Sequence, residues 1–67
     1  MENKLLRYIP KEYKNEVEDI RYGEVEWNEF TNRWNQLIVV TWKNGEEDTY
    51  QNATFMREKL KEFGRYV

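Results

Sequence analysis

The chain has no cysteine, histidine or serine among its 67 residues. Without thiols it cannot form disulfides or thiolate metal sites, and it also lacks the commonest general base and the two commonest nucleophiles. Only carboxylates, lysine and tyrosine are left for catalysis, and so short a chain has little depth for a cleft that holds substrate between two carboxylates. We therefore expect no enzymatic activity, no catalytic residue, no cofactor and no small-molecule substrate.

Long apolar runs are also absent. No stretch approaches the roughly 18 apolar residues of a membrane span. The segment MENKLLRYIP at residues 1–10 is too short and too interrupted by polar residues for a signal peptide. These absences predict a soluble cytoplasmic protein that makes no membrane contact.

Charge is nearly balanced overall but unevenly distributed, with 11 basic and 13 acidic residues. Residues 12–29 hold seven acidic against two basic side chains, whereas residues 53–67 hold four basic against two acidic ones. Glu46, Glu47 and Asp48 do not predict a metal site, because consecutive strand residues point to opposite faces and no calcium-binding loop surrounds them. They predict instead a solvated strand edge whose charges discourage pairing with other strands.

The stretch LIVVTWKNGEEDTYQ, residues 37–51, predicts a β-hairpin. Asn44-Gly45 is the preferred pair for a two-residue type I′ turn, in which both central residues need positive φ. Such a turn fixes the register. On one face it pairs Lys43 with Glu46, Thr41 with Asp48 and Val39 with Tyr50, and on the other Trp42 with Glu47, Val40 with Thr49 and Ile38 with Gln51. Strand 37–42 is apolar on both faces, which predicts a central strand covered on both sides.

The flanking segments complete the expected fold. Asn52 caps a predicted helix over residues 53–63, which places Phe55, Met56, Leu60 and Phe63 on one stripe and ends at Gly64. Residues 20–27 favour a first strand with a bulge or bend at Gly23, and a helix beginning at Pro10 with Tyr13, Val17 and Ile20 on one stripe is the alternative or a neighbour. Leu5, Leu6 and Ile9 form an apolar segment that is expected across the second sheet face.

Residues 1–67 are thus predicted to form a single small α+β domain: a three-stranded antiparallel meander packed against a C-terminal helix, with a short N-terminal helical segment. The segment 37–67 resembles the hairpin-plus-helix pattern of KTSC-type domains in its apolar strand, its glycine turn, the Tyr50 of its returning strand and its helix running into Gly64-Arg65-Tyr66. The whole chain, rich in Asn, Glu and aromatic residues, resembles proteins of phages and mobile elements of low-GC bacteria. Neither resemblance implies an activity or a catalytic residue.

The octapeptide WNEFTNRW, residues 27–34, contains the candidate contact residues. Its three rings would share one face of a short helix, whereas a strand followed by a loop would turn Trp27 inward with Val25 and leave Phe30 and Trp34 at the connection. We expect Trp27 in the core, because so small a domain buries only about 60% of its unfolded surface and needs its aromatic area. Trp34 and Arg33 lie in a polar, loop-like setting and are of the types enriched at binding hot spots.

These features favour a non-enzymatic module that binds a host or self protein. Trp34 would be its apolar anchor beside Arg33, and the acids of residues 12–29, among them Glu24, Glu26 and Glu29, would dock on a basic surface. Homo-oligomerisation through strand 37–42 is a related hypothesis. The alternative is nucleic-acid binding through Arg57, Lys61 and Arg65, which the acidic segment disfavours because it would repel phosphate.

Overall fold

The protein, represented by a computed structural model, is described over residues 4–64, which form six elements. These are the 3₁₀ helices η1 (Lys4–Tyr8) and η2 (Lys11–Glu16), the strands β1 (Val17–Asn28), β2 (Arg33–Trp42) and β3 (Glu47–Tyr50), and the helix α1 (Ala53–Phe63). The strands form one antiparallel sheet in the order β1-β2-β3. The expected α+β meander with a C-terminal helix is therefore confirmed.

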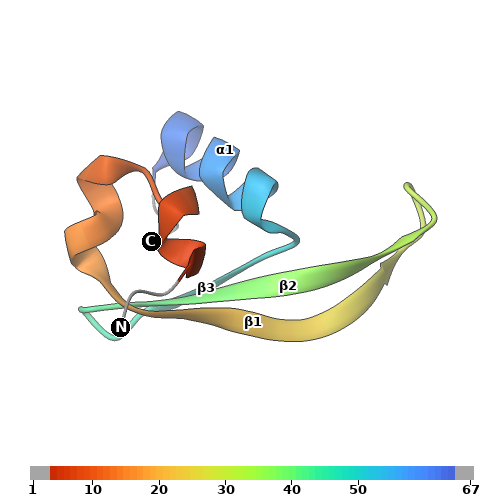
Figure 1. Ribbon diagram of the computed structural model, residues 1–67, viewed down its shortest axis with the longest axis horizontal. Coiled ribbons are helices and arrows are strands. Elements are labelled where there is room, and N and C mark those ends of the chain that lie inside the picture. Colours follow the sequence, from red (N-terminus) through yellow and green to blue (C-terminus); the bar gives the residue numbers. More distant parts are fainter. Residues whose placement is uncertain (1–3, 65–67) are drawn as a thin grey trace.

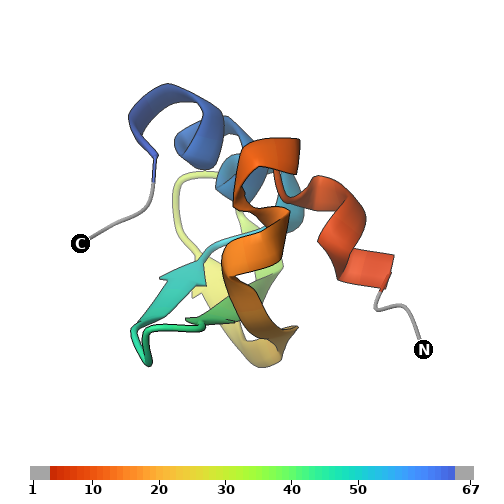
Figure 2. The same cartoon turned by 90° about the vertical axis from the view of Figure 1, so that its left-hand side faces the viewer.

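All helical segments lie on one face of this sheet. Figure 1 shows η1, η2 and α1 above the strands, and the turned view of Figure 2 shows the same two layers. The prediction that Leu5, Leu6 and Ile9 cross the second sheet face is wrong, since η1 packs beside α1 and its residue Leu5 is buried in the common core. A single helical layer buries more apolar area than two separate layers would, because η1 and α1 then pack against each other as well as against the sheet.

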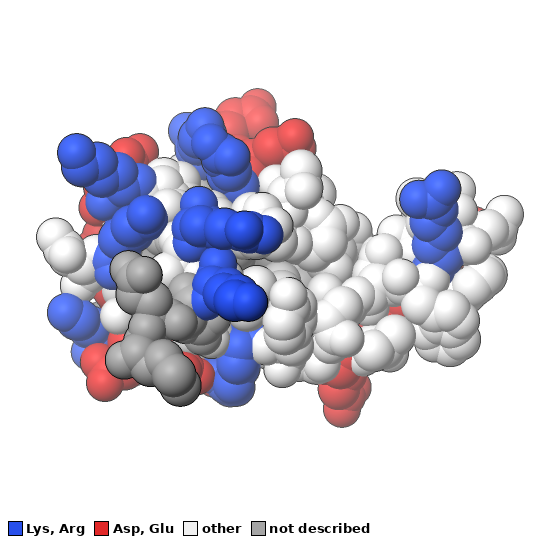
Figure 3. Space-filling view, viewed as in Figure 1, with Lys and Arg blue, Asp and Glu red and all other residues white. Residues whose placement is uncertain are grey.

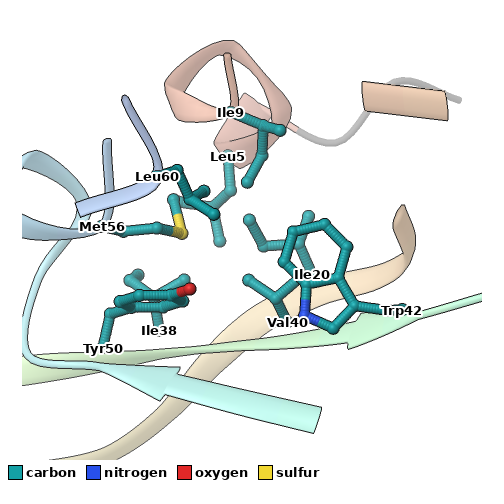
Figure 4. Packing of buried hydrophobic residues seen from close by; sticks show 9 residues of the cluster. All are labelled: Leu5, Ile9, Ile20, Ile38, Val40, Trp42, Tyr50, Met56 and Leu60. Carbon is teal, nitrogen blue, oxygen red and sulfur yellow. The ribbon is translucent and has the colours of Figure 1, made fainter. Parts of the chain in front are cut away.

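The core lies between this helical layer and the half of the sheet nearest the β2–β3 turn. Figure 4 shows its nine buried side chains converging from the two layers. They are Leu5, Ile9, Ile20, Ile38, Val40, Trp42, Tyr50, Met56 and Leu60. β2 contributes alternate residues, as expected for a strand with one face in the core. Its opposite face is only half-buried, so the prediction of a strand covered on both sides is also wrong.

The N-terminal helical turns and the first strand coexist, as one of the predicted alternatives states. Pro10 leads into η2, and the amide of Tyr13 donates to the Pro10 carbonyl over 2.9 Å. The chain becomes extended at Val17, where the cap residue has φ −83° and ψ 122°. Ile20 is then buried from β1 instead of from a helix.

The β2–β3 turn has three residues, not the two that were predicted. The amide of Gly45 donates to the Trp42 carbonyl over 2.9 Å, and the Trp42 amide donates to the Glu46 carbonyl over 2.8 Å. Gly45 has φ 91°, whereas Asn44 is not among the residues with positive φ. This arrangement is a type I turn followed by a left-handed glycine, the other common hairpin connection.

The extra turn residue moves the register by one and reverses which β3 side chains face the core. Tyr50 pairs with Ile38 instead of Val39, and Asp48 pairs with Val40. Tyr50 is therefore buried on the helical side. Asp48 lies on that side too, where it accepts a 2.7 Å hydrogen bond from the indole Nε1 of Trp42. The observed register is favoured because it adds the Tyr50 ring to the core.

The sheet face opposite the helices carries a polar network instead of a second layer. Arg21 lies opposite Val39 and donates to Asp19 over 3.0 Å, to Thr41 over 3.2 Å and to Glu47 over 3.1 Å. The bonds to Glu47 and Asp19 raise the pKa of Arg21 above its ordinary value. Stability from this shift is present at every pH below the ordinary arginine pKa and is lost only as the pH rises through the raised pKa.

Both predicted ends of α1 are confirmed. The Oδ1 of Asn52 accepts a 2.8 Å hydrogen bond from the Phe55 amide, and Gly64 ends the helix with φ 73°. The amide of Gly64 donates to the Leu60 carbonyl over 3.1 Å. Of the predicted stripe, Met56 and Leu60 are buried, while Phe55 is half-buried and Phe63 is exposed.

Substitution at Leu60 and Phe63 tests where the core ends. Leu60→Ala removes a buried side chain and should lower the free energy of unfolding by about 2–5 kcal/mol. Phe63→Ala, on an exposed ring of the same helix, should change it by less than about 0.5 kcal/mol. Urea denaturation followed by circular dichroism measures both. Equal losses in the two variants would contradict the placement of the core.

Candidate functional site: an aromatic hairpin arm

The β1–β2 hairpin extends beyond the helices that cover the sheet. With 11 residues, α1 is about 16 Å long, whereas the ten residues of β2 span about 33 Å. Figure 1 shows the far part of β1 and β2 projecting past α1, with its tip curving towards the helical side. We refer to residues 22–36 as the aromatic arm. It has no helical layer behind it, so its side chains remain accessible.

A bulge at Gly23 marks the base of the aromatic arm, as the sequence suggested. The pairing of β1 with β2 shifts between Tyr22 and Val25. The Nε2 of Gln36 donates a 2.6 Å hydrogen bond to the Gly23 carbonyl, which satisfies that bulged group from the opposite strand. A Cβ at position 23 would lie 2.9 Å from the Cγ2 of Val39, so only glycine lets the strands approach this closely.

Trp27 and Trp34 form a cross-strand pair within the aromatic arm. They are direct partners in the β1–β2 register, and their rings meet edge to face with centroids 5.4 Å apart and an interplanar angle of 68°. The prediction that Trp27 belongs to the core is wrong, because the ring is 48% exposed. Trp27 does share a sheet face with Val25, as predicted. That face, however, extends beyond the end of the helices. The pair stabilises the arm in place of a core.

The tip of the arm is a hydrogen-bonded turn. The Oδ1 of Asn28 accepts from the amide of Phe30 over 2.9 Å and from the amide of Thr31 over 3.2 Å. Asn32 has φ 54°, a left-handed conformation that asparagine adopts more readily than most residues. This turn holds Phe30 at the end of the molecule, where the ring is 99% exposed. The helical alternative for residues 27–34 is therefore wrong.

The predicted contact residues are brought together on this arm. Trp34 and Arg33 begin β2 instead of lying in a loop, and Trp34 is 68% exposed. Glu24, Glu26 and Glu29 are exposed along β1 and the tip. Among the described residues six large apolar side chains are exposed, and all but Phe63 belong to the arm: Tyr22, Val25, Trp27, Phe30 and Trp34.

An open hollow of about 250 Å³ lies at the outer part of the arm. β1, the tip, β2 and the connection between β3 and α1 all contribute to its walls. It is lined by Glu26, Trp27, Asn28, Glu29, Phe30, Asn35 and Gln51. The described lining residues are thus two acidic, two aromatic and three carboxamide residues, with no basic residue among them. Glu26 and Trp27 are consecutive in β1 and pair with Asn35 and Trp34, so their side chains point to opposite faces of the hairpin.

The predicted nucleic-acid residues lie on the other layer. Arg57 and Lys61 are exposed one turn apart on α1, and Arg65 lies outside the described residues. The ammonium of Lys59 lies 5.2 Å from the centroid of Phe55 and 4.7 Å from that of Phe63, which places this charge between two rings. Figure 3 shows Lys and Arg side chains gathered over the helical end of one face, whereas the projecting end is mostly uncharged there.

Charge is thus separated between the two layers. Residues 4–16 and 53–63, which form the helical layer, hold seven basic and four acidic side chains, a balance of +3. Residues 17–50, which form the sheet and its turns, hold three basic and eight acidic ones, a balance of −5. Any surface for an anionic partner would lie on the helices, and any surface for a cationic partner on the sheet and its arm.

Sequence reasoning missed several members of this surface. Tyr22 was assigned to a strand without regard to exposure, and Asn35 and Gln51 were not connected with the rings. Val25 was expected to point inward with Trp27, which is wrong because Val25 is exposed. If the predicted second strand had begun at Arg33 instead of at residue 37, it would have been much longer than the 11-residue helix that covers it. That difference in length would have predicted a projecting arm. That Gln51 lines the same hollow as residues of the arm has no local sequence signal.

Comparison with known proteins identifies no relative: no family model matches the chain, and neither a curated protein nor a solved structure is similar to it. The resemblance to KTSC-type domains and the phage or mobile-element origin therefore stay predictions. Over residues 4–64 no helix has the length and hydropathy needed to cross a membrane. In the same part of the chain no three acidic residues are grouped so that they could hold a metal ion.

A double-mutant cycle tests whether the tryptophan pair stabilises the arm. Trp27→Ala, Trp34→Ala and the double variant should show a coupling free energy of about 0.5–1.5 kcal/mol, because each ring loses its partner in either single variant. Urea denaturation gives the three values. Phe30→Ala is the control, with an expected change under about 0.5 kcal/mol because its ring is exposed. Strictly additive losses at positions 27 and 34 would contradict the pairing.

Proposed function

We propose that the protein is a non-enzymatic interaction module that binds a partner protein through the aromatic arm. The observation that carries this proposal is the exposure of Phe30 together with the Trp27 and Trp34 pair on one projecting hairpin. Clustered exposed rings on a small protein are typical of protein-binding surfaces, where Trp dominates the binding free energy. The absence of histidine, cysteine and serine supports a role in binding instead of catalysis.

Phe30 is the most informative of these residues. Burial of a phenylalanine side chain contributes about 1.5–3 kcal/mol, and the fold gains almost none of this from a ring that is 99% exposed. The two tryptophans at least stabilise each other. Phe30 is held outward by the turn that Asn28 organises, so its contribution is available to a partner.

The acidic side chains of the arm favour a partner with a basic surface. Glu24, Glu26 and Glu29 are exposed beside the rings, and Arg33 is the basic residue of the arm. Such a surface attracts a basic one, and screening by salt weakens the attraction over a Debye length of about 10 Å at 0.1 M. The proposed partner is a host protein or a second copy of the chain, and the proposed origin is a phage or mobile element.

Capture from a bacterial lysate tests the proposal. Tagged wild-type protein should retain a partner that Phe30→Ala and Trp34→Ala each bind at least about 2 kcal/mol more weakly, because hot-spot rings are lost. Phe63→Ala is the matched control, since it removes an exposed ring from α1 and leaves the arm intact. Quantitative mass spectrometry at low and high salt measures the retained proteins, and sedimentation of the wild type identifies self-association.

Two results would contradict a binding role for the arm. One is a set of captured proteins that is the same for the wild type and both arm variants. The other is a partner that is lost equally with Phe63→Ala, which would place the binding surface on α1.

The gathering of basic side chains over the helical layer favours nucleic-acid binding as the second candidate. Arg57 and Lys61 are its exposed cations on α1. If this function holds, fluorescence anisotropy at low salt should detect a duplex or single-stranded oligonucleotide at tens of micromolar protein, on the scale of about 10⁻⁴–10⁻⁶ M for non-specific binding. Arg57→Ala/Lys61→Ala should weaken it, while Phe30→Ala should not. No binding by the wild type would exclude this candidate.

A further inference from the structure

We propose that the side of the aromatic arm that faces the helical layer is a dimer interface, in which the arm of a second copy lies where the first copy has no helix. This inference rests on the proposed function, because it names the partner that the arm binds. It is carried by the face on which the exposed rings lie, by the shape of the two layers and by the distribution of charge.

The exposed rings of the strands lie on the same sheet face as the core. Tyr22 pairs with the buried Ile38, so both side chains point to the helical side. Trp34 lies four residues before Ile38 in β2 and returns to that side together with its partner Trp27. Val25 lies two residues before Trp27 and shares its face. We call this surface the helix-side face of the arm, and it consists of Tyr22, Val25, Trp27, Trp34 and Gln36, the partner of Val25.

The charged side chains of the paired strands of the arm lie on its other face. Glu26 pairs with Asn35, and Arg33 pairs with Asn28. Both pairs are one residue out of step with the tryptophans, so their side chains point away from the helical side. The helix-side face itself consists of three aromatic residues, one valine and one glutamine. Two such faces can therefore meet without bringing like charges into contact.

A second copy fits the step that the short helical layer leaves on the sheet. Figure 1 shows the helices over one end of the sheet and the arm projecting from the other. A second copy turned by 180° about an axis perpendicular to that view would place its arm over the first arm. Packed sheets are about 10 Å apart, close to the diameter of a helix, so the second arm would lie in the same layer as α1. The contact is reciprocal, as in two-fold symmetric dimers.

This arrangement also brings opposite charges of the two copies together. The aromatic arm, residues 22–36, holds three acidic side chains and one basic, a balance of −2. The helical layer has a balance of +3. Each tip would lie against the helical layer of the other copy, so the acidic arm meets a basic surface. Charge therefore favours this antiparallel dimer over one in which the two tips lie side by side.

The available area predicts a weak, reversible dimer. Tyr22, Trp27 and Trp34 are between 48% and 68% exposed. At about 150–250 Å² for each aromatic side chain, two copies would cover roughly 550–900 Å² of ring surface, to which Val25 and the tips add. Stable interfaces bury about 1,200–2,000 Å² in total, and weak ones less. We expect a Kd of roughly 10–100 µM.

Sedimentation equilibrium of the full chain over about 1–500 µM tests the inference, since the wild type should pass from monomer to dimer in this range. Val25→Lys places a charge in the interface and should raise the Kd at least about tenfold. Asn35→Lys is the matched control on the opposite face and should leave the Kd within about twofold. Each variant brings the net charge of −2 nearer to zero, so general repulsion cannot explain weaker association.

Two-dimensional ¹H–¹⁵N spectra locate the interface. On dilution of the wild type the indole signals of Trp27 and Trp34 should move, whereas that of Trp42, which is buried in the core, should stay in place. Trp34→Ala is a second variant on the helix-side face and should also raise the Kd at least about tenfold. The urea midpoint of Val25→Lys at low concentration should match that of the wild type, because Val25 is exposed in the monomer.

Three results would overturn the inference. They are a wild type that stays monomeric over the whole concentration series, equal weakening by Val25→Lys and Asn35→Lys, and dilution that moves neither arm indole. A monomeric chain that captures a lysate protein through Phe30 would reject the second copy and leave the proposed function standing. Loss of both self-association and arm-dependent capture would reject the proposed function as well.

Discussion

The packing of one helical layer against one half of one sheet face is the interaction on which the rest of the structure depends. Val40 and Met56 are fully buried at its centre, and the side chains of η1, β1 and β3 close around them. A chain of 67 residues has only enough apolar side chains for one such core. The other sheet face is covered by the polar network of Arg21, and the far part of the hairpin is left without cover.

This single core also determines how the surface is divided. The helical layer faces outward with a balance of +3, and the sheet and its turns have a balance of −5. Among residues 4–64 the exposed rings lie on the negative part, except for Phe63 on α1. Apolar area and negative charge therefore coincide on the aromatic arm, whereas the basic side chains of Arg57 and Lys61 are separated from the tryptophans. This coincidence favours a basic protein segment over a phosphate backbone as the partner of the rings.

Local signals predicted the parts of the fold that depend on neighbouring residues. Asn52 and Gly64 mark the ends of α1 because capping involves only a few consecutive residues, and Gly23 marks the bulge for a similar reason. The β2–β3 register was wrong because Asn44-Gly45 is compatible with two turn lengths. Only packing of Tyr50 beside Ile38 in the core selects the longer one.

The candidate site was likewise predicted only where residue type and neighbouring residues are sufficient. Arg33, Trp34 and the three glutamates were identified from residue type and polar context, and the structure brings them onto one arm. Trp27 was misplaced because alternation shows which face a side chain occupies, but not how far the covering helix reaches along the strand. The hollow is lined by Gln51 as well as by residues of the tip, which are far apart in sequence. A pattern of neighbouring residues cannot contain that information.

Exposure of so much apolar area is costly in a chain of this size, and the arm contains features that limit the cost. Burial of each large side chain would contribute about 1.5–3 kcal/mol, against a net stability of about 5–15 kcal/mol for a typical protein. The tryptophan pair and the Asn28 turn hold the hairpin without drawing on the core. Glu24, Glu26 and Glu29 alternate with the rings along the chain, and such charges oppose pairing of the free strand edge with another copy. In the proposed function, the same carboxylates that oppose edge pairing would also favour a basic partner.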